Sequence, residues 1–139
     1  MSIRQSFNAR VAGNIANNDL IGSLEFACAA AGAKVIVVMG HTSCGAIKVT
    51  IDNVVLGNLT GLLDKIKPAI SATSYSGERN SKNDAFVDAV AKMNVLQTIN
   101  DIRTQSDVLR SLEKSGVLKI VGAMYHLNDG KVEFELPAR

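Results

Sequence analysis

The sequence contains no tryptophan, only two prolines and only two cysteines in 139 residues. Two cysteines are too few for a disulfide framework, so the fold must be stabilised by a hydrophobic core, which a chain of this length can bury. No apolar run approaches the roughly 20 residues of a membrane-spanning helix, and the opening MSIRQSFNAR lacks the apolar centre of a secretion signal. These absences predict a single domain over residues 1–139, located in a reducing cytoplasm and without a membrane partner.

The sequence also lacks a strong charge of one sign. Its 15 Lys and Arg are scattered among 13 Asp and Glu, which gives a net charge of +2. Proteins that bind nucleic acid usually gather their basic residues on one face or along one helix. Since this chain has no such cluster, we expect no nucleic-acid partner.

Hydrophobic periodicity predicts strands and helices in alternation along the chain. Apolar residues at helical spacing predict helices over residues 19–31, 59–70, 84–101 and 105–115, with a further helix beginning near Ser43 or Cys44. Apolar runs or alternations predict strands over residues 6–12, 34–39, 117–125 and 131–136. This order predicts an α/β fold in which helices flank a mostly parallel sheet.

Three local signals refine this prediction. Residues 34–39 form a nearly continuous β-branched run, which is typical of a strand covered on both faces in a parallel sheet. Lys67-Pro68 is expected to close the second helix. The tight-turn sequence Asn128-Asp129-Gly130 predicts that the last strand folds back as an antiparallel edge strand at the C-terminus.

The stretch VIVVMGHTSCGAIK, residues 35–48, places His41 and Cys44 three positions apart after a predicted buried strand. The carboxyl ends of strands are where α/β sheets collect their chemistry. Imidazole and thiolate are common zinc ligands, and Gly40 and Gly45 free the backbone beside them. An isolated H-x-x-C also fits a buried core cysteine and a hydrogen-bonded turn histidine, so the spacing alone leaves both interpretations open.

Three segments carry a resemblance to a known family: RVAGN at 10–14, GSLEFACAAAGAKVIVVMGHTSCGAIK at 22–48 and VGAMYHLNDGKVEF at 121–134. Together they resemble the β-class carbonic anhydrases over almost the whole chain. The resemblance implies a β-carbonic-anhydrase-like fold, zinc as cofactor and a homo-oligomer such as a homodimer. It further implies that His41 and Cys44 are zinc ligands and that a pocket is shaped by Gly13, Asn14, Gly40 and Gly45.

The family's first zinc ligand has no counterpart in these residues. Family members hold zinc with one His and two Cys, and the first Cys lies in a C-x-D-S-R segment that also supplies an Asp-Arg pair. The 139 residues contain no such segment, so the chain resembles an N-terminally shortened member. Cys28 is the only other cysteine, and its apolar stripe with Leu20 and Leu24 predicts core packing. His126 is interpreted as a turn residue, and no catalytic residue is assigned.

The missing segment is the family's central first strand, between those resembling residues 6–11 and 35–39. We therefore expect either that these two segments pair directly or that a second chain covers their edges.

Two functions follow from the resemblance and its gap. The first is reversible hydration of carbon dioxide to bicarbonate by zinc hydroxide, if a third ligand exists. The alternative is a non-catalytic oligomeric α/β domain that binds a small anion or metal, or nothing. A third hypothesis is a sulfur-compound hydrolase with the same zinc architecture, which would lack the same third ligand.

Overall fold

The computed structural model describes residues 6–134. Its sheet contains β1 (Val35–His41), β2 (Lys119–Tyr125) and β3 (Val132–Phe134), in that order across the sheet. β1 and β2 are parallel, from Val35 opposite Lys119 to His41 opposite Tyr125. β2 and β3 are antiparallel, with Ala123 opposite Phe134. The predicted α/β fold and C-terminal antiparallel strand are therefore confirmed, and residues 135–136 of that strand lie outside the described part.

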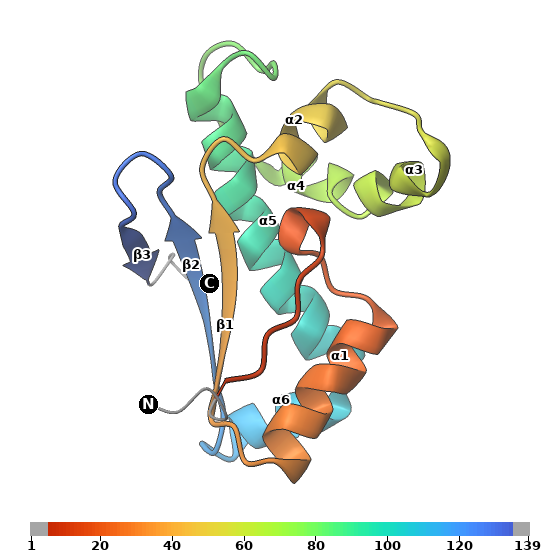
Figure 1. The fold of residues 1–139 in the computed structure, drawn as a ribbon, viewed down its shortest axis with the longest axis vertical. Coiled ribbons are helices and arrows are strands. Elements are labelled where there is room, and N and C mark those ends of the chain that lie inside the picture. The colour runs from red at the N-terminus through yellow and green to blue at the C-terminus, as the bar shows by residue number, and fades with distance from the viewer. Residues whose placement is uncertain (1–5, 135–139) are drawn as a thin grey trace.

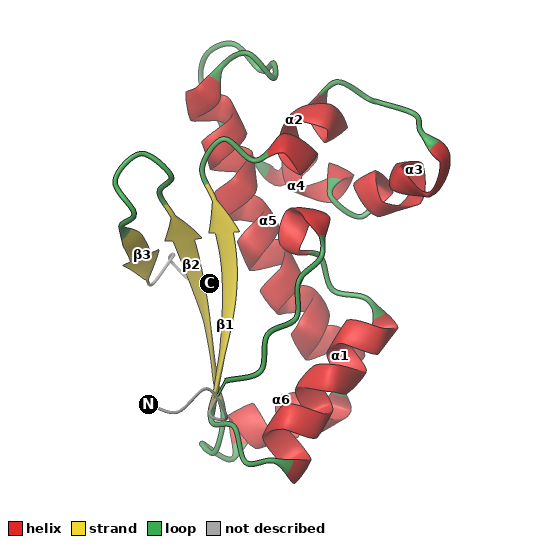
Figure 2. Ribbon diagram, in the orientation of Figure 1, coloured by secondary structure: helices red, strands yellow, loops and turns green. Residues whose placement is uncertain are grey.

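The helices lie beside the sheet, to its right in Figures 1 and 2. They are the 3-10 turn η2 (Ala12–Asn14), α1 (Asn18–Glu25), the π-helical η3 (Phe26–Ala30), α2 (Gly45–Ile51), α3 (Gly57–Asp64), α4 (Lys67–Ala72), α5 (Asp84–Gln105) and α6 (Asp107–Lys114). Side-chain caps explain two of the starts. The Asn17 carboxamide accepts from the Leu20 N–H before α1, and the Ser106 hydroxyl accepts from the Leu109 N–H before α6. Across the part of the chain that is described, no helix combines the length and apolar character that a membrane crossing requires.

The helix predicted over residues 19–31 is a regular α-helix followed by one π-helical turn. The Ala31 N–H donates to the Phe26 carbonyl at 3.0 Å, which is a five-residue step. Within this turn Ala27 and Cys28 face the core, whereas Phe26 is exposed. Cys28 thus packs in the core as predicted, and its burial raises the pKa of its thiol.

The strand predicted over residues 6–12 is wrong. Residues 6–11 form an extended loop that leads into η2. An apolar alternation can identify an extended segment, but a strand also requires a hydrogen-bonding neighbour. Among residues 6–134, β1 pairs with β2 alone, so the direct pairing of residues 6–11 with 35–39 does not occur.

The predicted closure of a helix at Lys67-Pro68 is also wrong. α3 ends at Asp64, and α4 begins at Lys67 with the proline in its first turn. Proline is tolerated there because the first N–H groups of a helix have no partner within the helix.

The core lies between the sheet and α5. Ile36 and Val38 of β1 and Ile120 and Met124 of β2 are buried with the apolar face of this long helix. The opposite face of β1 is open, because every second residue from Val35 is exposed. The expected cover on both faces is therefore wrong for this chain alone, since all the described helices that contact β1 do so from one side.

Candidate metal-ligand turn

His41 and Cys44 lie on one strand-turn-helix at the carboxyl end of β1. His41 is the last residue of the strand, and Cys44 immediately precedes the first residue of α2. Cys44 is 5% exposed, and His41 is half-buried. The structure thus places both predicted ligands where the sequence expected them, within one four-residue turn.

The His41 ring is held by its own main chain. Its Nδ1 lies 2.8 Å from the Thr42 carbonyl oxygen. A carbonyl oxygen can only accept, so this contact assigns the proton to Nδ1 and leaves the Nε2 lone pair free in the neutral imidazole. A free Nε2 with a carbonyl-bonded Nδ1 is one of the forms in which histidine binds metals.

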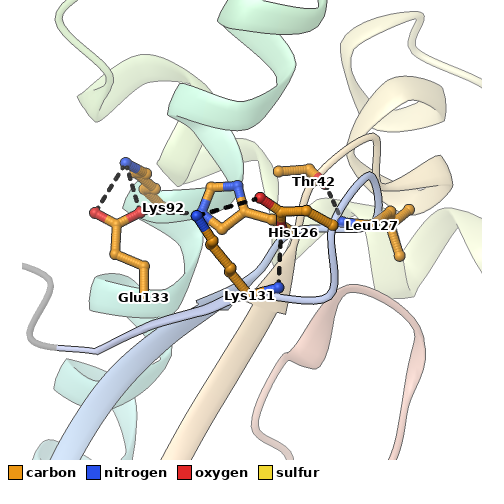
Figure 3. A network of polar contacts seen from close by, with 7 residues as sticks. Thr42, Lys92, His126, Leu127, Lys131 and Glu133 are labelled. Atoms are coloured by element: carbon orange, nitrogen blue, oxygen red, sulfur yellow. Dashed lines mark hydrogen bonds and ion pairs between the residues drawn. The ribbon is translucent and has the colours of Figure 1, made fainter.

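Three hydrogen bonds from other elements fix the backbone of the turn. The Thr42 N–H donates to the Tyr125 carbonyl at 3.0 Å, and the Leu127 N–H donates to the Thr42 hydroxyl at 3.0 Å, as Figure 3 shows for the second contact. The Ser43 N–H donates to Asp88 Oδ1 of α5 at 2.9 Å. Ser43 has a φ of 52°, in the left-handed region that residues other than glycine rarely adopt.

Two of the predicted pocket glycines form close packing contacts. A Cβ added to Gly40 would lie 2.9 Å from Val95 Cγ2 and 3.0 Å from Met124 Sδ, and one added to Gly13 would lie 2.5 Å from Ile66 Cδ1. Gly13 also has a φ of 71°. Gly45 differs, because nothing lies within 4 Å of an added Cβ.

Asn14 joins η2 to α5 near Gly40. The Thr98 hydroxyl donates to the Asn14 carbonyl at 3.0 Å, and Asn94 Nδ2 donates to the Gly13 carbonyl at 2.6 Å. Asn14 Nδ2 is buried without an acceptor among the described residues. The sequence pointed to Asn14 but not to Asn94 and Thr98, which α5 buries; the signal that could have found them is their position, as polar residues, on an otherwise apolar helix face.

The described residues do not complete a zinc site. Within residues 6–134, no group of three or more His, Cys, Asp or Glu side chains is placed to hold a metal ion. His41 and Cys44 have the right donor chemistry, but a zinc site in a protein takes three or four ligands. A surface groove of about 570 Å³ lies instead between residues 7–9 and α1, away from both candidate ligands.

His126 belongs to a separate polar network on the β2–β3 hairpin (Figure 3). Its Nε2 lies 3.2 Å from Glu133 Oε2, and Lys92 Nζ of α5 lies 3.3 Å from the same oxygen. The His126 hydrogen bond and then the Lys92 hydrogen bond and charge lower the pKa of Glu133. The main chain of His126 donates to the Lys131 carbonyl at 2.8 Å and so closes the hairpin.

The fold and the turn define an α/β protein with a His-x-x-Cys turn at the carboxyl end of a parallel strand pair. The carbonic anhydrase family model matches residues 1–132. The chain therefore belongs to the β-class carbonic anhydrase family, as the resemblance implied.

Curated relatives agree with this assignment. The carbonic anhydrase of Mycolicibacterium smegmatis is 31% identical over an alignment of 132 residues, which covers 91% of this chain and 61% of the relative. The carbonic anhydrase of Synechococcus elongatus is 30% identical over an alignment of 138 positions, which covers 91% of this chain and 49% of the relative. This chain thus spans about half to three fifths of the length of these relatives.

Solved structures share the fold. The β-carbonic anhydrase CafA of Aspergillus fumigatus matches with a TM-score of 0.77 and 22% identity, over 94% of this chain and 64% of its own. Tetrameric β-carbonic anhydrases of Sordaria macrospora match with a TM-score of 0.75 and 20% identity, over 91% of this chain and 66% of theirs. At these identities the likeness supports the architecture alone.

Proposed function

We propose that this protein is a zinc-dependent carbonic anhydrase that catalyses the reversible hydration of carbon dioxide to bicarbonate. In this proposal His41 and Cys44 are two of the zinc ligands. The third is a ligand that residues 6–134 of this chain do not supply. The observation that carries it is the turn itself, where a half-buried imidazole with a free Nε2 stands three residues before a buried thiol. Membership of the family supports zinc as the metal.

A homo-oligomer is part of the same proposal. The open face of β1 exposes Val35, Val37 and Met39, and β1 has a free edge in the described residues. Exposed strand edges and apolar faces are usually covered in stable proteins. A second copy would cover this side, and the tetrameric state of the Sordaria macrospora enzymes supports such an assembly.

The test measures metal, mass and activity on the same sample. The protein is purified without an affinity tag or added metal, its zinc content and oligomer mass are determined, and carbon dioxide hydration is assayed. We expect about one zinc ion per chain and measurable hydration. His41→Ala and Cys44→Ser should lose both zinc and activity. Cys28→Ala is the control, because this cysteine packs in the core on η3 and should not affect zinc content.

A non-catalytic role is the second candidate, and the absence of a three-donor group among residues 6–134 favours it. In this role the chain is an oligomeric α/β domain whose remaining turn binds a small anion, a metal or nothing. Little zinc and no hydration in a correctly folded oligomer would support this role. Full zinc content in Cys44→Ser would contradict the proposed ligand set.

A further inference from the structure

The turn that carries both candidate ligands is fixed by one side chain from a distant part of the chain. Three hydrogen bonds join this turn to other elements. Two of them involve the main chain of Tyr125, at the end of β2, and of Leu127, in the turn after it. The third comes from Asp88, whose Oδ1 accepts from the Ser43 N–H at 2.9 Å across 45 residues of sequence. A carboxylate that accepts from a main-chain N–H makes a stronger bond than a neutral acceptor does.

Ser43 is the residue whose conformation most needs support. Its φ of 52° is in the left-handed region, which is unfavourable for an L-residue other than glycine. Ser43 also lies between His41 and Cys44, so its backbone angles set how the imidazole and the thiol are oriented toward each other. If Ser43 relaxed to a common conformation, the orientation of the two donors relative to each other would change.

Asp88 belongs to a well-packed helix, while its hydrogen bond with Ser43 is solvent-exposed. It is half-buried on α5, and its neighbours Val87 and Val90 are fully buried in the core. α5 is the longest helix described and packs against both long strands. The carboxylate is therefore attached to the most extensively packed element of the described chain.

We infer that Asp88 is a positioning residue that holds the His41–Cys44 turn in its metal-binding shape through the Ser43 N–H. This inference rests on the proposed function, because the turn must bind a metal for its shape to matter. Among the described residues, Asp88 is not placed with His41 and Cys44 in a three-donor metal group, so the role inferred for it is positioning and not ligation. Its role is to accept the hydrogen bond that stabilises the left-handed residue between them.

The first experiment is a titration of the metal-free oligomer with cobalt(II), followed by thiolate-to-cobalt charge-transfer absorption. Loss of a residue that orients a ligand typically weakens metal binding by about 10–100-fold, and we expect this loss in Asp88→Ala. Asp88→Asn keeps an oxygen acceptor and should bind within about threefold of the parent. Equal weakening in Asp88→Asn and Asp88→Ala would overturn the inference.

Asp84→Ala is the matched control. Asp84 lies one turn earlier on α5 and pairs with Lys48 at 3.5 Å, so its removal also deletes a carboxylate from this end of the helix. It makes no hydrogen bond to the turn among the described contacts. Cobalt affinity and the absorption band should be unchanged in Asp84→Ala. A loss equal to that of Asp88→Ala would mean that general charge, and not the Ser43 contact, is responsible, and would overturn the inference.

A second readout requires no metal. Iodoacetamide labelling of the metal-free protein, with the labelled cysteine identified by mass spectrometry, measures how often each buried thiol becomes accessible. Cys44 is 5% exposed and Cys28 is 6% exposed, so Cys28 is an internal reference in the same chain. We expect Asp88→Ala to accelerate the labelling of Cys44 by about tenfold and to leave Cys28 and the circular dichroism spectrum unchanged.

The two readouts separate the two proposals. If the parent protein binds no cobalt, the proposed function fails, and the Cys44 labelling rate still decides whether Asp88 holds the turn. An unchanged Cys44 rate in Asp88→Ala would overturn the inference even in a protein that binds cobalt. Equal acceleration at Cys44 and Cys28 would indicate general loosening of the fold and would overturn it as well.

Discussion

The two faces of the sheet differ sharply in how this chain covers them. On the inner face Ile36 and Val38 are 6% and 7% exposed, and Met124 is fully buried against α5. On the outer face Val35 and Met39 are 54% and 41% exposed. Successive strand residues alternate between faces, so His41 belongs to the outer series with Met39. The open face of β1 and the candidate ligand His41 thus lie on the same side of the strand, whereas Cys44 is buried in the core.

The largest difference between the faces should appear when a methionine is shortened. Met124→Ala removes a fully buried side chain and leaves a cavity, so we expect the free energy of unfolding to fall by about 2–5 kcal/mol. Met39→Ala shortens an outer side chain that is 41% exposed in the single chain, so a monomer should lose less than about 1 kcal/mol, whereas the proposed oligomer should lose more. Urea unfolding monitored by circular dichroism measures both.

This comparison also tests whether the outer face is covered in solution. If Met39→Ala destabilises the protein as much as Met124→Ala does, another chain must bury Met39. The loss should then shrink when the protein is diluted, since oligomer stability depends on concentration. A small loss at every concentration would indicate that the outer face stays exposed.

The next largest difference in stability should separate two single glycine-to-alanine variants, one on each side of the candidate ligand turn. Gly40→Ala would bring a Cβ to within 2.9 Å of Val95 Cγ2, so we expect a loss of about 1–3 kcal/mol from overpacking. Gly45→Ala adds a methyl group in open space in the first turn of α2 and should be neutral or stabilising by up to about 1 kcal/mol. Thermal unfolding of the two variants measures the contrast. Equal losses would contradict the packing described at Gly40.

The smallest expected effect is at the hairpin edge of the sheet. Because the contacts of Glu133 with His126 and Lys92 lower its pKa, its stabilising effect is present above its ordinary pKa of 4.5 and is lost as the pH falls below that value. The loss in Glu133→Gln should be under about 1 kcal/mol at pH about 6, because the pair is half-exposed.

The pH series distinguishes this contact from a general effect of charge. The difference between the parent and Glu133→Gln should shrink as the pH falls through the lowered pKa of Glu133, below which the carboxylate is protonated in both the folded and unfolded states. Glu78→Gln is the control, because Glu78 is an exposed loop acid that hydrogen-bonds only its neighbour Asn80 through its side chain among the described contacts. A difference for Glu133→Gln that persists unchanged at low pH would show that its ionisation is not the cause.

The sequence predicted most of the elements because their signals are local. The β-branched run of β1, the apolar spacing of α5 and the Asn128-Asp129-Gly130 turn each identify a structure without knowledge of the rest of the chain. The same run could not show that only one face of β1 is covered here. An apolar strand has the same sequence whether its second face is buried by its own helices or by a partner.

The candidate site could be predicted only where its residues are close together in the sequence. His41 and Cys44 are three residues apart, so their proximity follows from the sequence once the strand and helix are placed. The Asp88 contact could not be predicted in this way. It joins residues 45 positions apart, and an acidic residue beside buried valines on a helix is ordinarily solvated.

The hydrogen bond between Thr42 and Leu127 connects residues 85 positions apart. During synthesis, β1 and the ligand turn leave the ribosome long before β2 and its following turn can pair with them. Parallel strand pairing with such a long intervening segment is slow, because the chain must close a large loop before any contact forms. The candidate metal-ligand turn should consequently be among the last parts of this protein to reach its native shape, and any metal that binds there would encounter a formed turn only after the sheet has closed.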